Sequence, residues 1–129
     1  MFEAKYKYHR IGAKGKAKLI EKLRRALEEE DVALAILFGS FVELSSYRDI
    51  DVAVYMGEAD LKAIARLSAK LEEKLCAPVD VVPIDNMPTK LKHHVLTKGL
   101  VILERVKGLY EALYMQTIDE LALLKGASS

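Results

Sequence analysis

Cysteine, side-chain amides and long apolar runs are scarce in this 129-residue sequence. The single cysteine, Cys76, excludes an internal disulfide and fits a reducing compartment; we expect it to be buried as a small apolar residue. No apolar run approaches the ~18 residues of a membrane span, and the charged, alternating N-terminus lacks the apolar segment of a signal peptide. The protein is therefore expected to be cytoplasmic, without a membrane partner.

The sequence also lacks internal repeats and low-complexity linkers. A chain of this length forms one domain by the usual relation between length and domain number. We expect that domain to comprise residues 1–126, and residues 127–129 to be a disordered tail. Helical and strand-like apolar segments alternate, which predicts an α/β (α+β) fold with a small mixed sheet of about four or five strands flanked by helices.

The expected elements follow from apolar periodicity and from turn residues. Helical spacing and capping residues predict four helices, at about 16–30, 60–75, 88–98 and 108–125. Apolar runs predict four strands, at 32–38, 49–56, 78–84 and 100–104. Alternating polarity predicts a further edge strand at 2–8, followed by a turn at 11–15. Gly99 is expected to close the third helix, and 41–48 to form a polar loop.

Positive charge is concentrated at the start of the chain. Nine Lys or Arg residues lie among the first 25, against two Glu, and the acidic run 28–31 follows. Such a patch would suit nucleic acid or nucleotide phosphate. The helical spacing of the charges around Leu19, Leu23 and Leu27 instead favours a solvent-exposed helix face that the acidic run balances. A nucleic-acid partner therefore rests on charge asymmetry alone.

The most informative segment is 36–56, where two apolar runs flank a short polar stretch. The first run ends at Gly39-Ser40, and a glycine there lets the backbone turn sharply and approach a ligand. Backbone N–H groups and the Ser40 hydroxyl can then hold phosphate oxygens. Asp49 and Asp51 open the second run, and positions i and i+2 of a strand share a face. Because buried charge is costly without a partner, this pair indicates a cation or a solvent-filled cleft.

Asp80 is the third acidic candidate. It is the only charged residue in the apolar run 79–82, and it joins the other two aspartates if that strand lies beside 49–56. Three aspartates at apolar strands indicate a site for divalent metal that carries nucleotide phosphates. Two-metal phosphoryl-transfer sites hold their ions roughly 3.5–4 Å apart.

The set Gly39, Ser40, Asp49, Asp51 and Asp80 resembles the motif of the minimal nucleotidyltransferases of the DNA polymerase β superfamily. The resemblance implies the polymerase β-type fold and transfer of a nucleoside monophosphate from an NTP. It also implies that the three aspartates bind two Mg²⁺ ions and act as the catalytic residues, while Gly39 and Ser40 bind the triphosphate.

Within that superfamily the sequence looks most like the small MntA-like antitoxins, which pair with a HEPN-domain toxin. The resemblance therefore implies an antitoxin-like enzyme that uses ATP, or another NTP, to modify a protein acceptor such as a HEPN toxin.

The loop before Asp49 departs from the family pattern. The family has a longer loop there than the eight residues 41–48, and the glycine usual in that loop is replaced in the region of Glu43 and Leu44. Arg48 stands where the family has a small polar residue. It can neutralise Asp49 or bind a phosphate as a bidentate donor. These departures favour an alternative function, a catalytically weak or inactive antitoxin that binds a HEPN toxin as a protein partner.

A second basic cluster comprises Lys90, Lys92, His93 and His94. One exposed helix face is favoured over a phosphate-facing role, and metal binding by the two histidines is disfavoured because adjacent helical positions diverge by about 100°. The sequence leaves the acceptor, the base of the NTP and the oligomeric state open, a homo-oligomer included.

Overall fold

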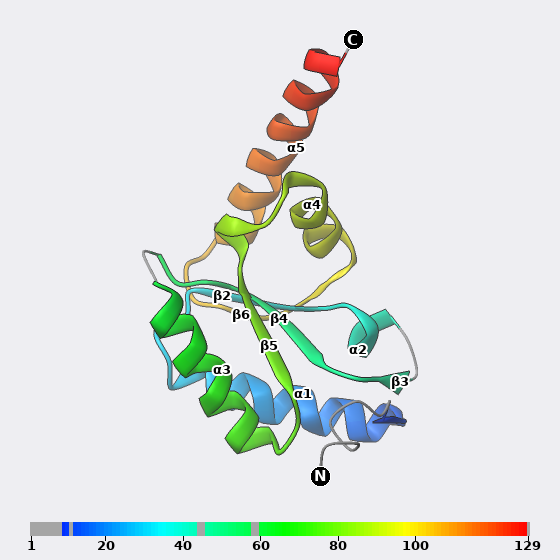
Figure 1. The fold of residues 1–129 in the computed structure, drawn as a ribbon, viewed down its shortest axis with the longest axis vertical. Helices are drawn as coiled ribbons and strands as arrows, with labels where there is room; N and C mark the ends of the chain where they lie inside the picture. The colour runs from blue at the N-terminus through cyan, green and yellow to red at the C-terminus, as the bar shows by residue number, and fades with distance from the viewer. Residues whose placement is uncertain (1–8, 11, 44–45, 58–59, 129) are drawn as a thin grey trace.

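Four apolar runs build a mixed β-sheet at the centre of the protein (Figure 1). The structure is a computed structural model that describes residues 9–10, 12–43, 46–57 and 60–128. The strands are β2 (Leu34–Phe38), β4 (Ile50–Tyr55), β5 (Val79–Pro83) and β6 (Leu100–Glu104), in the spatial order β5-β4-β2-β6. β2 pairs antiparallel with β4 and β6, whereas β4 and β5 are parallel. This arrangement confirms the predicted fold class.

Helices cover both faces of the sheet (Figure 1). The helices α1 (Ala13–Glu28) and α3 (Leu61–Leu75) pack on one face, against side chains that include Val52 and Val81. The helices α4 (Thr89–Lys98) and α5 (Leu109–Ser128) pack on the other, where Ala53 and Val82 lie. Since strand side chains alternate between faces, Asp51 and Asp80 belong to the face that α4 and α5 cover.

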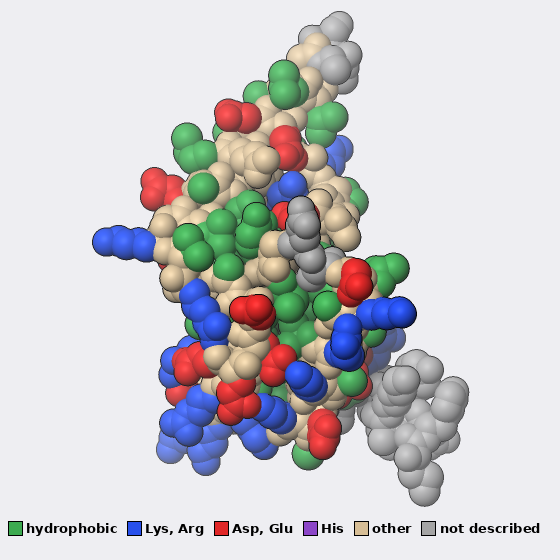
Figure 2. All heavy atoms as spheres, turned by 90° about the vertical axis from the view of Figure 1, so that its left-hand side faces the viewer, with side chains coloured by type: hydrophobic (Ala, Val, Ile, Leu, Met, Phe, Trp, Pro, Cys, Tyr) green, Lys and Arg blue, Asp and Glu red, His purple; other side chains and the backbone are tan. Residues whose placement is uncertain are grey.

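The last helix, α5, continues beyond the sheet (Figure 1). It ends three residues later than the sequence predicts. Hydrophobic side chains are exposed along its projecting part (Figure 2), among them Met115, Leu123 and Leu124. None of the helices in the described part of the chain combines the length and apolar character that a membrane crossing requires.

The predicted polar loop at 41–48 instead contains two short elements. α2 (Ser40–Glu43) follows β2 directly, and β3 (Ser46–Tyr47) pairs antiparallel with β1 (His9–Arg10). The helical turn forms because Phe41 is buried in the core and because the Val42 and Glu43 N–H groups donate to the Gly39 carbonyl, at 3.1 Å each. The strand predicted at 2–8 lies outside the described residues.

Cys76 is exposed, so the expectation that it would be buried was wrong. It caps the C-terminus of α3 in the left-handed conformation, with φ 53°. This conformation turns the chain away from the helix and leaves the thiol in solvent. The structure also contains a short helix that the sequence did not predict, η2 (Ile84–Asn86).

The acidic run after α1 ties two helices together. Glu29 and Glu30 pair with Lys74 and Lys70 of α3, the second pair at 3.2 Å. Arg105 donates to backbone carbonyls at the end of α1, including that of Glu30 at 2.9 Å. Figure 2 shows Lys and Arg side chains gathered at the lower end of this side, where α1 and α3 lie. The run therefore does not simply balance the lysines of α1, since two of its members pair with lysines of α3.

Gly99 joins α4 closely to the central strand β2. It closes α4 as predicted, donating its N–H to the Val95 carbonyl at 2.8 Å. A Cβ at this position would lie 2.5 Å from Ile36 Cγ2 and 2.8 Å from the Leu37 carbonyl oxygen. Only glycine lets the end of α4 approach the sheet this closely.

We predict that Gly99→Ala lowers the free energy of unfolding by about 2 kcal/mol or more, because backbone atoms of α4 and β2 would have to separate. Urea unfolding measures the effect. Gly126→Ala in α5 is the matched control, since an added methyl there meets nothing within 4 Å in the described structure. Alanine favours a helix over glycine by up to about 1 kcal/mol, so this control should unfold no more easily than the wild type. Equal stability of the two variants would contradict the close approach.

Candidate active site

Asp51 and Asp80 lie side by side on neighbouring strands. They are register partners in the parallel pair of β4 and β5. Hydrogen bonds fix this register at the start of β5: Ile50 N–H donates to the Pro78 carbonyl at 3.0 Å, and Val79 N–H donates to Glu72 Oε1 of α3 at 3.1 Å. The two carboxylates therefore project from the same face, next to each other.

Asp49 lies immediately before β4 rather than inside it. Its charge nevertheless acts on Asp51. The pKa of Asp51 is raised to about 6, first by burial and then by the negative charges of Asp80 and Asp49, against an opposing effect of Arg48. Asp49 and Asp80 therefore both lie near enough to Asp51 for their charges to act on it. The ionised Asp51 is destabilised there by its own neighbours.

Gly39 provides the space that the Asp51 carboxylate occupies. Its φ of +79° is a left-handed conformation that favours glycine. A Cβ on Gly39 would also lie 2.5 Å from Asp51 Oδ2. The Gly39 turn and the carboxylate of β4 are therefore in contact, as expected for a glycine that lets backbone approach a functional group. Ser40 follows as the first residue of α2.

Arg48 contacts Asp49, with Nε 3.5 Å from Oδ2. Half of the Arg48 side chain is exposed, and exposed ion pairs contribute only ~0–1 kcal/mol. The structure thus agrees with the first of the two roles expected for Arg48. The pair is weak enough for the guanidinium to exchange partners.

The basic cluster on α4 does not form one exposed face. Lys92 is buried and pairs with Glu120 of α5, at 3.5 Å, because α5 packs over that side of the helix. His93 turns toward Tyr114, with ring centroids 6.4 Å apart. His94 instead reaches α2, where its Nε2 lies 3.4 Å from Glu43 Oε1. One exposed face therefore describes only part of this cluster.

Within the described residues, no group of three or more His, Cys, Asp or Glu side chains is close enough together to hold a metal ion as they stand. The chemistry of the three aspartates nevertheless fits magnesium. Carboxylate oxygens are its preferred protein ligands. The pKa of Asp51 is raised by burial and by the neighbouring carboxylates, and a divalent cation would offset both effects by favouring the ionised form.

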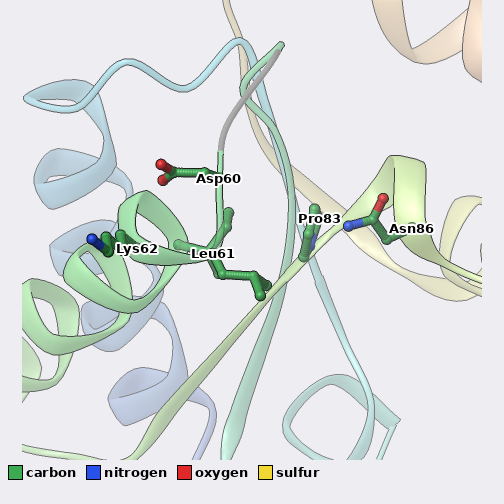
Figure 3. Close-up of a pocket in the computed structure, with 6 residues that line it drawn as sticks. Asp60, Leu61, Lys62, Pro83 and Asn86 are labelled. Atoms are coloured by element: carbon green, nitrogen blue, oxygen red, sulfur yellow. The ribbon is translucent and has the colours of Figure 1, made fainter.

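A separate groove of about 510 Å³ lies at the other end of β5 and contains none of the predicted site residues. Leu61, Pro83 and Asn86 are among its lining residues. Figure 3 shows the Asp60 carboxylate and the Lys62 ammonium pointing away from Pro83 and Asn86. The groove lacks converging polar groups of the kind that orient a ligand, so the aspartates remain the better candidate site.

The family of the chain follows from comparison with known proteins. A family model described as Polymerase beta, Nucleotidyltransferase matches residues 21–107, which is more than half of the chain. The chain belongs to the polymerase β nucleotidyltransferase family. The matched segment runs from α1 to just past β6 and contains Gly39, Ser40 and the three aspartates. The predicted resemblance is thereby confirmed. No curated protein sequence matches this chain.

Three solved structures that this chain resembles come from toxin–antitoxin systems. A chain of a toxin–antitoxin crystal structure with AMP-PNP is 27% identical, with a TM-score of 0.73 over 84% of this chain and 90% of that one. A chain of a tri-AMPylated Shewanella oneidensis HEPN toxin in complex with MNT antitoxin is also 27% identical, with a TM-score of 0.71 over 87% and 91%. An MntA-HepT structure matches at 25% identity and a TM-score of 0.70, over 86% and 91%.

Two features of the site were not predicted from sequence. The contact between Gly39 and Asp51 depends on the pairing of β2 with β4, although a glycine at a strand end was a signal for it. The contact between Glu43 and His94 joins residues far apart in the chain, and no sequence pattern indicated it.

We predict that Asp51→Asn stabilises the metal-free protein at neutral pH. Because the folded-state pKa of Asp51 is raised from 3.8 to about 6, ionisation costs the wild type stability as pH rises through that window. The variant should gain on the order of 1 kcal/mol above pH 6, a value reduced for partial solvent screening, and little near pH 4. Urea unfolding at several pH values measures the difference.

Asp119→Asn, at an exposed position of α5, is the control and should show no such gain at any pH. A gain of equal size for Asp51→Asn at pH 4 and pH 7.5 would contradict the raised pKa.

Proposed function

We propose that this protein is a magnesium-dependent nucleotidyltransferase that transfers AMP, or another nucleoside monophosphate, to a HEPN-type toxin, as part of a toxin–antitoxin pair. The observation that carries the proposal is the alignment of Asp51 with Asp80, beside Asp49 and the Gly39-Ser40 turn. These are the residues on which the family's chemistry depends. Membership of the family supports nucleotide as the substrate.

Each residue of the site has a separate role in the proposed reaction. Asp49, Asp51 and Asp80 would hold Mg²⁺, which when bound neutralises phosphate charge and stabilises the attacking and leaving oxygens. The Ser40 hydroxyl and the backbone at Gly39 bind the β- and γ-phosphates. Asp80, the exposed member, accepts the proton of the acceptor hydroxyl. A bond forms between that oxygen and the α-phosphorus, the bond to the bridging oxygen breaks, and pyrophosphate leaves.

The partner and the nucleotide are inferred from the solved relatives. One is a structure of a toxin–antitoxin with AMP-PNP, and another is a complex of a tri-AMPylated HEPN toxin with its MNT antitoxin. This chain shares their fold over more than four fifths of its length. A HEPN-type protein as acceptor and ATP as donor are the combination that these relatives support.

A second candidate function is that of an antitoxin that binds its toxin without modifying it. Two observations favour it: Arg48 lies against Asp49, and the described side chains form no ready metal group. The intact set of aspartates counts against it. The two functions make different predictions for a labelling experiment.

We predict that the protein, incubated with α-labelled ATP, Mg²⁺ and the protein encoded by the neighbouring gene, transfers label to that protein. Asp51→Asn should reduce the transfer rate on the order of 100-fold or more, because charge stabilisation by the metal is worth several kcal/mol. EDTA should abolish transfer.

Asp119→Asn serves as the matched control and should transfer at the wild-type rate. A tight complex that carries no label would support the binding function instead. Transfer by Asp51→Asn at the wild-type rate would remove the metal hypothesis.

A further inference from the structure

The helix α4 contacts α2 on the side where Ser40 lies. Ser40 and Glu43 are three residues apart in α2, so their side chains are neighbours on one face, with Cβ atoms about 5–6 Å apart. His94 of α4 contacts Glu43 on that face, at 3.4 Å between Nε2 and Oε1. The imidazole therefore contacts a side chain on the face of α2 that also carries Ser40.

The C-terminal end of α4 approaches the same turn from β2. Gly99 packs against the Leu37 carbonyl, two residues before Gly39. Lys98 directly precedes Gly99 and is exposed. It lies four residues after His94, so the two side chains project from the same side of α4. Two contacts, of His94 with Glu43 and of Gly99 with Leu37, thus hold the C-terminal half of α4 beside the strand and the turn that carry Gly39 and Ser40.

Lys92 and His93 of the basic cluster are engaged elsewhere, and Lys90 lies in the first turn of α4, at the opposite end from Gly99. Lys92 pairs with Glu120, and His93 faces Tyr114. His94 is about half-exposed, as is Glu43, and Lys98 takes part in no ion pair among the described residues. His94 contacts α2, and Lys98 adjoins the contact of Gly99 with β2, so these two basic side chains of α4 are placed to meet an anion at Ser40.

We propose that His94 and Lys98 form a second wall of the triphosphate site, and that Glu43 holds His94 until nucleotide phosphates displace it. The proposal rests on the proposed function, since it needs the triphosphate at Gly39-Ser40. An exposed ion pair is worth only ~0–1 kcal/mol. A polyphosphate carries more charge and more acceptor oxygens than one carboxylate, so it competes successfully for the imidazole. Glu43 is then a built-in competitor of the substrate.

The test measures equilibrium binding of ATP with Mg²⁺ by isothermal titration calorimetry. His94→Gln should weaken binding about tenfold, the value of one hydrogen bond to a charged group. Glu43→Gln should tighten binding up to about fivefold, because the competitor is gone. The double variant should match His94→Gln alone, since Glu43 acts only through His94. Inorganic tripolyphosphate should show the same pattern, whereas AMP should bind equally to all variants.

His93→Gln is the matched control, because it changes the adjacent histidine on another side of the helix; its affinity should stay within about twofold of the wild type. Urea unfolding confirms that all variants fold.

Equal weakening by His93→Gln and His94→Gln, additive effects of Glu43→Gln and His94→Gln, or an effect on AMP would overturn the proposal. If ATP binds with the expected pattern but no label is transferred, only the proposed transferase function fails. If the wild type does not bind ATP, both fail.

Discussion

The placement of the partly buried Asp51 beside two other carboxylates is the constraint on which the rest of this structure depends. The register of β4 and β5 places Asp51 directly beside Asp80, and Asp49 adds a third negative charge. A fold selected for stability alone would not place these charges together at the edge of an apolar sheet. The cost is met by the buried strands and helices around them, which fix the strand register. The ionised carboxylate of Asp51 is destabilised at this site, and a bound cation would remove that cost.

The surrounding elements serve this site in different ways. Gly39 leaves space for the Asp51 carboxylate and lets the chain turn into α2, which presents Ser40. Gly99 brings α4 close to β2, so that α4 and α2 face each other across the turn. Both glycines are needed because they lack a side chain, which lets neighbouring atoms of Asp51 and of β2 come close to the backbone. A single methyl at either position would displace a part of the site.

Much of this could be predicted from sequence, because apolar periodicity determines the order of helices and strands. The sequence placed Asp51 and Asp80 at the starts of two strands and left open whether those strands are neighbours; the pairing of β4 with β5 makes the two residues adjacent, and their function remains a prediction. α2 could not be predicted, because burial of Phe41 overrides the polarity of its neighbours. Lys92 was assigned to the wrong environment, since its partner Glu120 lies on another helix. Partners on different helices are brought together by tertiary packing, and the local sequence pattern contains no information about it.

A crystal structure with a non-hydrolysable ATP analogue and Mn²⁺, with anomalous scattering used to locate the metal, tests the central claim most directly. We predict manganese coordinated by Asp51 and Asp80, with the β- and γ-phosphates at Gly39 and Ser40. Arg48 should then have moved away from Asp49. An analogue bound without metal at these aspartates, or the Arg48 guanidinium in the place of the metal, would contradict the account.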